Sequence, residues 1–508
     1  MWLYKKGTHI KMINPINQTN NVKTSIFYIN DYHGKSINME RTVTASNAFD
    51  ARTKKQKDVD TFKLSSGDIM IGEDFKTNQL AVKFQKIIGI QASAVGNHEY
   101  DMQEKVGAIL PLISYDLLSA NVKINPRNPW HHIIKPSVIE ERNGHKYGII
   151  GTSPIDLFKR SKEGVIQKDI AVSKIDDTIK DVQKEVNKLQ EQGVNKIILI
   201  SHLGFTFEKA IAKHTQGIDV ILGGHSHDLL FDVVEGKNLV YSKAGEPVII
   251  TQAGRDGKNF GILNLEFDEN GIIRKVQNNI GYTRSFKRYA PAKYIFDKIF
   301  GVRETYGYVK SAPPALKYDL IEPNAHAYFI TDCIRQNLSC DIAILPSSNI
   351  RGHFEPGKVD TRILADILPF QNKLYKMKYS EKDIVDAVKF ACKSFTNIAN
   401  KPGIFYMSGI KYMTNTNGNL QSMSYVDRLG NEIPIDIDNP RENKYYITVL
   451  NDYCAQGNDG FTHLNQPGNI IEKYDFDATK CVQEVLQQSR DEVDIYDDGR
   501  IQIVPPKA

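Results

Sequence analysis

Five short polar blocks contain the side chains of this chain that could bind metal ions. They supply aspartate, histidine and asparagine, and they are Asp31–His33, Gly67–Asp68, Gly96–Asp101, Ser201–His202 and Gly223–His227. An apolar run that predicts a β-strand leads into almost every block, and a strand that ends at a polar residue brings that residue to one edge of a sheet. Mixed nitrogen and oxygen donors suit Mn, Zn, Fe or Co better than Ca, and they also tolerate Mg. The pattern therefore predicts a hydrolase with two metal ions.

Asp68 has the surroundings expected of a residue that bridges two ions. Two metal ions about 3.5–4 Å apart can hold both the attacking and the leaving oxygen of a phosphoryl displacement, and ions so close need an anionic group between them. Asp68 follows three small residues. Asp31 and His33 are two positions apart, so in a strand they would face the same side and bind one ion together. His225 and His227 share this spacing, but the glycines before them predict a loop that could direct each to a different ion.

The remaining donors complete the site and suggest a proton donor. Asn97 offers a neutral carbonyl oxygen, and His202 offers another nitrogen. His98 follows Asn97 directly, so its side chain is expected to point away from that ligand and to donate a proton to the leaving oxygen. Asp101, three residues further on, could hold the imidazole in its useful tautomer. His98 and Asp101 are therefore predicted to be a general-acid pair rather than ligands.

Each of these residues also has an ordinary structural interpretation. Asp68 could be a helix N-cap, Asn97 an Asx turn and Asp101 a carboxylate at the start of a helix. His202 could be a half-buried imidazole with its hydrogen bonds satisfied. All five blocks in this order, each at the end of a predicted strand, are hard to explain as independent accidents, so the joint pattern favours the metal site.

The length of 508 residues predicts two domains, because single hydrophobic cores seldom extend beyond about 300 residues. Residues 22–286 alternate between strand and helix patterns, and Lys174–Gln190 has the clearest apolar stripe of a helix. The charged and aromatic stretch at residues 285–308 predicts a connecting helix. The second domain is expected to comprise residues 306–508. In that domain helices are expected around Ala325–Gln336 and Lys382–Ser394, and strands at Asp341–Leu345, Ile404–Lys411 and Tyr445–Leu450.

Charge, apolar content and cysteine spacing indicate which kinds of partner and which cellular location to expect. The net charge of +5 is small for this length and no dense stripe of lysine and arginine is present, which predicts that the chain does not bind nucleic acid. No apolar run approaches the length of a membrane span. The first 21 residues lack the apolar centre of a secretory signal, which predicts a cytoplasmic protein if the recorded start is the natural one. The five cysteines include no C-x-x-C pair and are expected to be buried, reduced thiols. The sequence carries no signal for an oligomeric state.

The polar blocks resemble the motifs of the calcineurin-like metallophosphoesterases, and the whole chain resembles their 5'-nucleotidase branch, the bifunctional UDP-sugar hydrolase/5'-nucleotidase type. The resemblance implies an α/β (α+β sandwich) fold, in which a four-layer N-terminal domain is joined by a helical linker to a C-terminal α/β 5'-nucleotidase domain. It also implies two divalent ions and a catalytic dyad of His98 with Asp101. One ion would be held by Asp31, His33, Asp68 and His227, and the other by Asp68, Asn97, His202 and His225.

The second domain resembles the nucleotide-binding domain of the same family. Leu368–Asn372 matches the L-P-F-x-N segment, and Asn451–Phe461 matches a loop with a second aromatic residue and an aspartate. The resemblance implies that Phe370 and Tyr453 stack on a nucleobase, that Asn372 contacts the edge of the base and that Asp459 binds the ribose hydroxyls. Arg351 is the expected clamp for a phosphate or carboxylate group. Considered without the resemblance, these residues would be core, turn or surface residues.

Two segments depart from the family pattern. The family usually has N-G-G-G-I-R where this chain has Pro346–Arg351, and an arginine is missing near Glu322–Tyr328. The leading prediction is a phosphohydrolase that acts on nucleoside 5'-monophosphates or related nucleotides. The alternatives are hydrolysis of 2',3'-cyclic nucleotides or UDP-sugars at the same site, a thiosulfohydrolase of the same plan, and a nucleotide-binding interaction protein without turnover.

Overall fold

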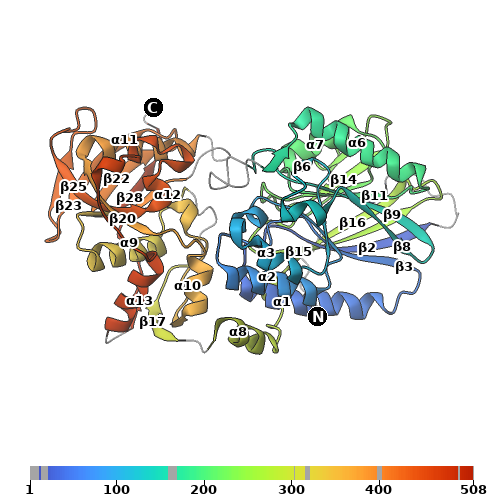
Figure 1. The fold of residues 1–508 in the computed structure, drawn as a ribbon, viewed down its shortest axis with the longest axis horizontal. Helices are drawn as coiled ribbons and strands as arrows, with labels where there is room; N and C mark the ends of the chain where they lie inside the picture. Colours follow the sequence, from blue (N-terminus) through green and yellow to red (C-terminus); the bar gives the residue numbers. More distant parts are fainter. Residues whose placement is uncertain are drawn as a thin grey trace. The chain divides into compact units, whose positions relative to one another are not determined.

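A computed structural model describes most of the chain, namely residues 11–12, 21–157, 169–301, 304–314, 321–396, 403–489 and 492–506. The chain divides into two compact units, Met1–Gly301 and Val302–Ala508 (Figure 1). Each unit has its own hydrophobic interior and is described by itself below.

The first unit is built on two large sheets. The eight-stranded sheet has the order β1 (Lys11–Met12), β16 (Ile273–Tyr282), β15 (Asn259–Phe267), β2 (Val22–Ile29), β3 (Val59–Ser65), β4 (Ala92–Ala94), β5 (Asp116–Leu118) and β7 (Ile134–Lys135). The six-stranded sheet has the order β13 (Leu239–Tyr241), β14 (Pro247–Thr251), β12 (Val220–Leu222), β11 (Ile197–Ser201), β9 (His145–Thr152) and β8 (Ser137–Arg142). A two-stranded sheet pairs β6 (Val122–Ile124) with β10 (Ile170–Val172).

Helices cover the outer faces of both large sheets, which gives four layers. Alternate residues of β2 show why: Ile26 and Tyr28 pack between the sheets, whereas Phe27 and Ile29 pack against the helices. The helices on this side are α1 (Ser36–Thr53), α2 (Phe75–Ile88) and α8 (Ala292–Phe300), and those on the other sheet are α6 (Ile175–Glu191) and α7 (Phe205–His214). Figure 1 shows α1 and α2 on one side of the unit and α6 and α7 on the other. Because the central strands are covered on both faces, their sequences are continuous apolar runs. The expected four-layer arrangement is confirmed.

Parallel pairing brings the ends of the central strands to one edge. β2, β3 and β4 are parallel neighbours in one sheet, and β9, β11 and β12 are parallel neighbours in the other. The polar blocks follow β2, β3, β4, β11 and β12 in turn. The hydroxyl of Ser66 donates to the carbonyl of Leu222 at 2.7 Å, so the edges of the two sheets meet at the same end.

The connection to the second unit differs from the expectation. Helix α8 is much shorter than the predicted range of 285–308, because Pro291 precedes it and Gly301, at a φ of 86°, follows it. Residues Thr305–Ser311 form strand β17 instead of helix. The segment contains Thr305, Tyr306, Tyr308 and Val309, which are residue types that favour a strand.

Three sheets form the second unit around one core. The five-stranded sheet has the order β21 (Phe405–Ser408), β18 (Ile342–Pro346), β25 (Tyr445–Asn451), β20 (Leu374–Ser380) and β26 (Ile470–Lys473). The others are β24 (Glu432–Ile435), β23 (Leu420–Val426), β22 (Ile410–Asn415) and β28 (Ile501–Val504), and β19 (Gly357–Asp360), β17 and β27 (Val493–Asp494). The range Ile404–Lys411, expected to be a strand, is divided between β21 and β22, because Gly409 turns the chain at a φ of 87°.

Helices cover the five-stranded sheet. α9 (Ala325–Asn337) packs on β18 and β21, and α13 (Ala478–Gln488) lies beside α9. α11 (Glu381–Cys392) packs on β20 and begins at Ser380 with a capping box completed by Asp383. The five cysteines lie in this unit and all are buried and free, as expected.

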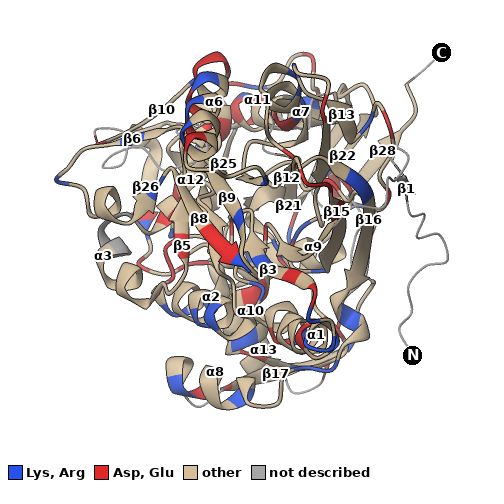
Figure 2. Ribbon diagram, turned by 90° about the vertical axis from the view of Figure 1, so that its right-hand side faces the viewer, with Lys and Arg blue, Asp and Glu red and all other residues tan. Residues whose placement is uncertain are grey.

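Charged residues of both signs are interspersed on the helices of the first unit. Acidic and basic residues alternate along α6 instead of separating into faces (Figure 2). No helix in the described part of the chain has the length and apolar character to cross a bilayer.

Candidate active site

The five polar blocks meet where the edges of the two sheets come together. The N–H of Asp31 donates to the carbonyl of Gly67 at 3.0 Å, which joins the first block to the second. His202 joins the second block to the fourth, because its Nδ1 lies 2.6 Å from the carbonyl oxygen of Ser66. The N–H of His225 lies 3.1 Å from Oδ2 of Asp31, which adds the fifth block to the first. Segments far apart in the sequence are thus brought into one cluster.

Five of the predicted ligands have left-handed backbone conformations. The φ angles are 52° for Asp31, 49° for His33, 51° for Asp68, 72° for His225 and 60° for His227. Side chains other than glycine lose about 1–2 kcal/mol in this region. The expectation that Asp31 and His33 share a strand is wrong, because β2 ends at Ile29. Left-handed residues on either side of Tyr32, not the alternation of a strand, direct the side chains of Asp31 and His33 inward.

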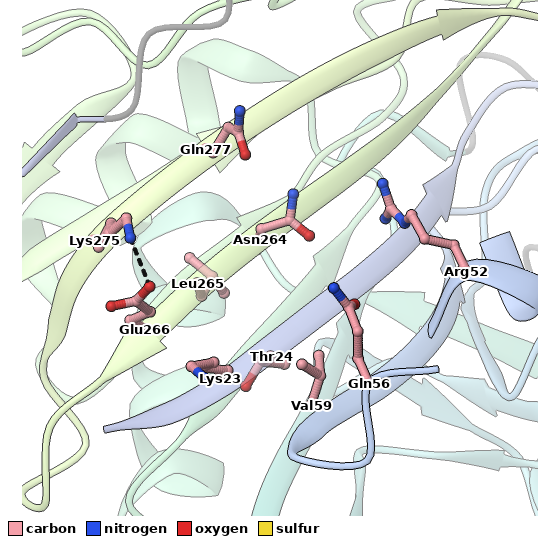
Figure 3. Close-up of a pocket in the computed structure, with 10 residues that line it drawn as sticks. All are labelled: Lys23, Thr24, Arg52, Gln56, Val59, Asn264, Leu265, Glu266, Lys275 and Gln277. Atoms are coloured by element: carbon pink, nitrogen blue, oxygen red, sulfur yellow. Dashed lines mark hydrogen bonds and ion pairs between the residues drawn. The ribbon is translucent and has the colours of Figure 1, made fainter. Parts of the chain in front are cut away.

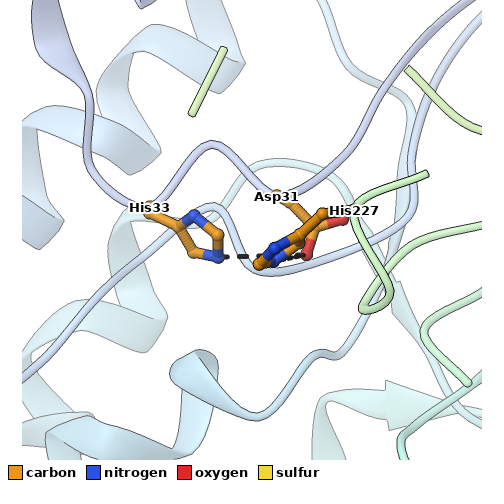
Figure 4. A group of neighbouring side chains, drawn as sticks. All are labelled: Asp31, His33 and His227. Atoms are coloured by element: carbon orange, nitrogen blue, oxygen red, sulfur yellow. Dashed lines mark ion pairs between the residues drawn. The ribbon is translucent and has the colours of Figure 1, made fainter. Parts of the chain in front are cut away.

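A first donor set consists of Asp31, His33 and His227, with Asp68 beside it. Figure 4 shows the first three side chains converging. Nε2 of His227 lies 3.4 Å from Oδ1 of Asp31, and Nε2 of His33 lies 3.8 Å from the same oxygen. Nε2 of His33 is also 3.6 Å from Oδ2 of Asp68. All three are within the spacing needed for one ion, since their donor atoms lie within 4.8 Å of one another.

A second donor set consists of Asp68, Asn97, His202 and His225. Donor atoms of Asp68, His202 and His225 lie within 4.8 Å of one another. Nε2 of His202 is 3.0 Å from Oδ2 of Asp68, and Nδ1 of His225 is 3.1 Å from Oδ1 of Asn97. Asp68 therefore lies between the two donor sets, which is the position predicted for a bridging carboxylate.

His202 provides a test of whether these residues fit a metal ion. Its Nδ1–H donates to the carbonyl of Ser66, which leaves the lone pair on Nε2. Nε2 is buried and has no hydrogen-bond partner among the described residues, although Oδ2 of Asp68 is only 3.0 Å away. An imidazole nitrogen and a carboxylate oxygen this close need a positive charge between them, which a proton on Nε2 or a metal ion supplies. Donor atoms that share one ion at about 2.1 Å lie about 3.0–3.4 Å apart, so the donors fit a divalent ion.

The electrostatics of His202 support the same conclusion. Burial alone lowers the pKa of this imidazole, but the carboxylates of Asp68 and Asp31 outweigh burial and raise the pKa to about 10. The side chains of all three residues are almost completely buried. The cluster therefore attracts positive charge at Nε2.

His98 and Asp101 form the hydrogen bond predicted for a general-acid pair. Nδ1 of His98 lies 2.6 Å from Oδ2 of Asp101, and the same oxygen accepts the N–H of Gly72 at 2.8 Å. The backbone N–H of His98 donates to Oδ1 of Asp68 at 2.9 Å. A donor atom of His98 also lies within 4.8 Å of those of His33 and Asp68, so the imidazole borders the donor sets directly.

Glu99 supports the bridging carboxylate and was missed by the sequence analysis. It is 3% exposed and accepts backbone N–H groups from Asp68 at 2.9 Å, Ile69 at 2.8 Å and Gly96 at 2.7 Å. Gly96 must remain small, because a Cβ atom there would lie 2.1 Å from Oδ1 of Asp68. The motif that contains Asn97 and His98 thus also contains the residue that fixes the loop of Asp68.

Buried polar residues outside the five blocks support the loop of the two histidines. Glu208 on α7 accepts the N–H of Gly224 at 3.2 Å, and Gln252 donates to Glu208 at 2.9 Å and to the carbonyl of Gly224 at 3.2 Å. Burial raises the pKa of Glu208 to about 8. Asp156 lies 3.1 Å from Nε2 of His225. Spacing in the sequence gives no signal for these contacts, because the residues lie on separate elements.

Four of the five nucleotide-binding residues predicted in the second unit form two pairs. Arg351 lies over the ring of Phe370, with Cζ 5.4 Å from the ring centroid. The hydroxyl of Tyr453 donates to Oδ1 of Asp459 at 3.1 Å. Arg351 lies just after β18, and Tyr453 lies in the short helix α12 (Asp452–Ala455) just after β25; these two strands are parallel neighbours.

Asn372 is positioned by an asparagine that the sequence analysis did not single out. Oδ1 of Asn349 accepts one hydrogen bond from Nδ2 of Asn372 at 3.2 Å and another from Nδ2 of Asn451 at 3.1 Å. All three residues are buried. Asn349 belongs to the segment that departs from the family pattern, so this departure places a side chain where the family has a glycine run.

A hollow on the eight-stranded sheet lies away from the candidate site. Figure 3 shows its lining, which is Lys23, Thr24, Arg52, Gln56, Val59, Asn264, Leu265, Glu266, Lys275 and Gln277. Two of its lysines form ion pairs, Lys275 with Glu266 at 2.8 Å and Lys23 with Asp58 at 2.6 Å. The first residues of β2 and β3 border it, whereas the polar blocks follow the last residues of those strands.

Comparison with known families assigns both units. Residues 24–229 match the family described as calcineurin-like phosphoesterase, and residues 315–466 match the family described as 5'-nucleotidase, C-terminal domain. The chain is a calcineurin-like phosphoesterase of the 5'-nucleotidase type. The predicted family, fold class and hydrolytic enzyme class of this phosphoesterase are thereby confirmed. The family uses divalent metals, in agreement with the donor sets.

Relatives of this phosphoesterase match along most of its length. A protein named "Probable 5'-nucleotidase" from Treponema pallidum (strain Nichols) is 25% identical over 529 residues, which cover 87% of each chain. The 5'-nucleotidase of Diplobatis ommata is 26% identical over 503 residues, which cover 91% of this chain and 84% of that protein. The crystal structure of a 5'-nucleotidase precursor from Thermus thermophilus has the same fold, with a TM-score of 0.77, 22% identity and coverage of 96% of this chain and all of that one.

Proposed function

We propose that this chain is a dinuclear-metal-dependent phosphohydrolase that removes the phosphate group from nucleoside 5'-monophosphates or related nucleotides. One observation carries the proposal: the carboxylate of Asp68 lies between two sets of metal donors, and the imidazole of His98 lies beside it. The names of the relatives support a nucleotide as the substrate.

Residues 22–286 would form the metal domain. Asp31, His33, Asp68 and His227 would hold one ion, and Asp68, Asn97, His202 and His225 the other. When bound, a pair of divalent ions, whether Mn, Zn, Mg, Co or Fe, supplies positive charge to the oxygens of a phosphoryl group. The carboxylate of Asp68 keeps the two donor sets together, and Glu99 holds the loop of Asp68 in place by accepting the backbone N–H groups of Asp68, Ile69 and Met70.

His98 and Asp101 would complete the reaction by moving a proton. The hydrogen bond between Nδ1 of His98 and Asp101 orients the imidazole and leaves Nε2 free to face the substrate. Protonated His98 then donates its Nε2 proton to the leaving oxygen of the nucleoside, which departs as a neutral hydroxyl. A water molecule supplies the oxygen that replaces the nucleoside oxygen on phosphorus, and inorganic phosphate is the other product.

Residues 306–508 would form the substrate domain. We assign stacking on the nucleobase to Phe370 and Tyr453, contact with the edge of the base to Asn372, and contact with the ribose hydroxyls to Asp459. Arg351, which lies over Phe370, would bind an anionic group of the nucleotide. The bond between Tyr453 and Asp459 supports this assignment, because it orients the carboxylate next to an aromatic face.

The test is a substrate screen of metal-free protein before and after addition of Mn, Co, Zn or Mg. We expect metal-dependent release of phosphate, fastest with nucleoside 5'-monophosphates. Faster hydrolysis of a 2',3'-cyclic nucleotide or of UDP-glucose would replace the monoester assignment by a diester one. Nucleotide binding without turnover of any substrate, including p-nitrophenyl phosphate, would instead show an interaction protein.

A further inference from the structure

Asp256 contacts the first donor set through its backbone and its side chain, although it lies outside all five polar blocks. Its N–H donates to the carbonyl of Asp31 at 2.6 Å, and its carbonyl accepts Nδ2 of Asn38 at 2.8 Å. Its Oδ1 lies 3.1 Å from Nδ1 of His33. Asp256 lies in the turn after β14 and is only 4% exposed. It therefore connects this turn, within the interior of the unit, to the loop of Asp31 and His33.

An aspartate at this position costs free energy in backbone strain and in burial of its charge. Its side chain must therefore make a contact that a glycine could not make. The φ of Asp256 is 58°, between glycines at 254 and 257 that are also left-handed. A side chain other than glycine loses about 1–2 kcal/mol there. Burying a carboxylate adds a further cost unless charged partners offset it. Arg255 at 3.5 Å and Lys258 at 3.6 Å are those partners, and the imidazole of His33 adds a hydrogen-bond contact.

The contact with Asp256 decides which nitrogen of His33 can bind an ion. A carboxylate accepts hydrogen bonds, so the proton of the imidazole belongs on Nδ1 and the lone pair on Nε2. Nε2 points to Asp31 at 3.8 Å and Asp68 at 3.6 Å. Without the carboxylate of Asp256, the imidazole can place its proton on Nε2, and this tautomer binds no metal through that atom.

We propose that Asp256 is a positioning residue that holds His33 as an Nε2 ligand and thereby retains the ion of the first donor set. The proposal depends on the metal centre of the proposed function, but it concerns metal binding and not turnover. The second donor set has no equivalent buried charge among the described residues. Nδ1 of His202 meets the carbonyl of Ser66, and the side chain of Asp156 beside His225 is 27% exposed.

The test compares Asp256→Asn and Asp256→Ala with the wild-type chain by titrating metal-free protein with Mn or Co in a calorimeter. Loss of a carboxylate that orients a histidine ligand weakens metal binding about 10–100-fold. We expect this loss for one of the two ions in Asp256→Asn, and a loss at least as large in Asp256→Ala. The other ion should bind as in the wild type. Asp232→Asn, an exposed change in the same unit, is the matched control.

Thermal unfolding of the metal-free variants separates positioning from a structural role. Because Asn keeps the size of the side chain, Asp256→Asn should unfold within a few degrees of the wild type while one ion binds more weakly. Equal affinity for both ions in wild type and Asp256→Asn would overturn the proposal, as would equal weakening of both ions with a large loss of thermal stability. Failure of the wild-type chain to bind any divalent ion would overturn the proposed function itself.

Discussion

Nε2 of His202 lies 3.0 Å from Oδ2 of Asp68, and both side chains are almost completely buried. Nδ1 of His202 is already committed to a backbone carbonyl, so Nε2, which faces Asp68, is the nitrogen that can bind an ion. The same carboxylate lies 3.6 Å from Nε2 of His33 in the first donor set. A carboxylate that faces the Nε2 atoms of two imidazoles can share a cation with each of them, which makes Asp68 the centre of the site.

The first prediction concerns Asp68→Asn. An amide in place of the carboxylate removes the negative charge shared by both donor sets, so both ions should bind more weakly and kcat/KM should fall at least about 10²-fold. Elemental analysis of dialysed protein measures the metal content, and phosphate release measures the activity. Asp58→Asn is the control, because Asp58 is an exposed aspartate paired only with a surface lysine in the described residues. Normal metal content in Asp68→Asn would contradict a bridging role.

The second prediction separates proton donation from metal binding. His98→Ala should lower kcat for nucleoside monophosphates about 10²–10⁴-fold, the usual contribution of a general acid. The loss should be much smaller with p-nitrophenyl phosphate, because p-nitrophenolate leaves without a proton. His214→Ala changes an exposed histidine of the same unit and should have no effect.

The metal content of His98→Ala decides between two roles. A donor atom of His98 lies within 4.8 Å of those of His33 and Asp68. If His98 were a ligand, its removal would release an ion and reduce the hydrolysis of both substrates equally. A general acid predicts full metal content and a loss that depends on the leaving group.

Strand positions and the polar residues after them could be predicted from the sequence, because local patterns determine both. Apolar runs such as Ile197–Ser201 become central strands, and parallel pairing then places the residues after them at one edge. The motif around Asn97 and His98 is itself local. The candidate site could therefore be located before any coordinates were known, although the roles of its residues remain predictions.

Backbone turns and contacts between distant residues could not be predicted in this way. Asp31 and His33 were expected in a strand, but both have left-handed backbone conformations. Residue types alone do not determine the φ angle at such positions. Asp256 meets His33 across 223 positions of the sequence, and Asn349 meets Asn451 across 102. Such contacts depend on how the sheets pack, and no spacing within one segment encodes them.

The third prediction concerns acid stability of the second unit. Burial opposes ionisation of Glu381, but hydrogen bonds from Arg441 and Tyr446 outweigh burial and lower its pKa from 4.5 to about 2. A carboxyl group whose pKa is lowered on folding stabilises the protein fully above its unfolded pKa and loses this effect as the pH falls through its folded pKa. Glu381 should therefore contribute about 1–3 kcal/mol near pH 7, and this contribution should decline from about pH 4.5 to about pH 2.

Urea unfolding of Glu381→Gln and of the wild type across this pH range measures the contribution. The difference in unfolding free energy between them should be largest near neutral pH and should shrink as the solution is acidified. Glu442→Gln, an exposed change near Arg441, is the control and should show no such dependence. A difference that stays constant from pH 7 to pH 2 would show that the charge of Glu381 does not stabilise the unit.

The fourth prediction concerns recognition of the sugar. In Tyr453→Phe the aromatic face remains, but the hydrogen bond of 3.1 Å to Asp459 is lost. A hydrogen bond to a charged group contributes about 1.5–3 kcal/mol, so a poorly oriented Asp459 should raise KM for ribonucleotides by roughly 10-fold or more. 2'-Deoxyribonucleotides lack one of the two hydroxyls assigned to Asp459, and their KM should therefore rise less. Tyr496→Phe, at an exposed tyrosine of the same unit, is the control. An equal rise in KM for both sugars would mean that Tyr453 acts through stacking alone, and the assignment of Asp459 to the ribose would then lose its support.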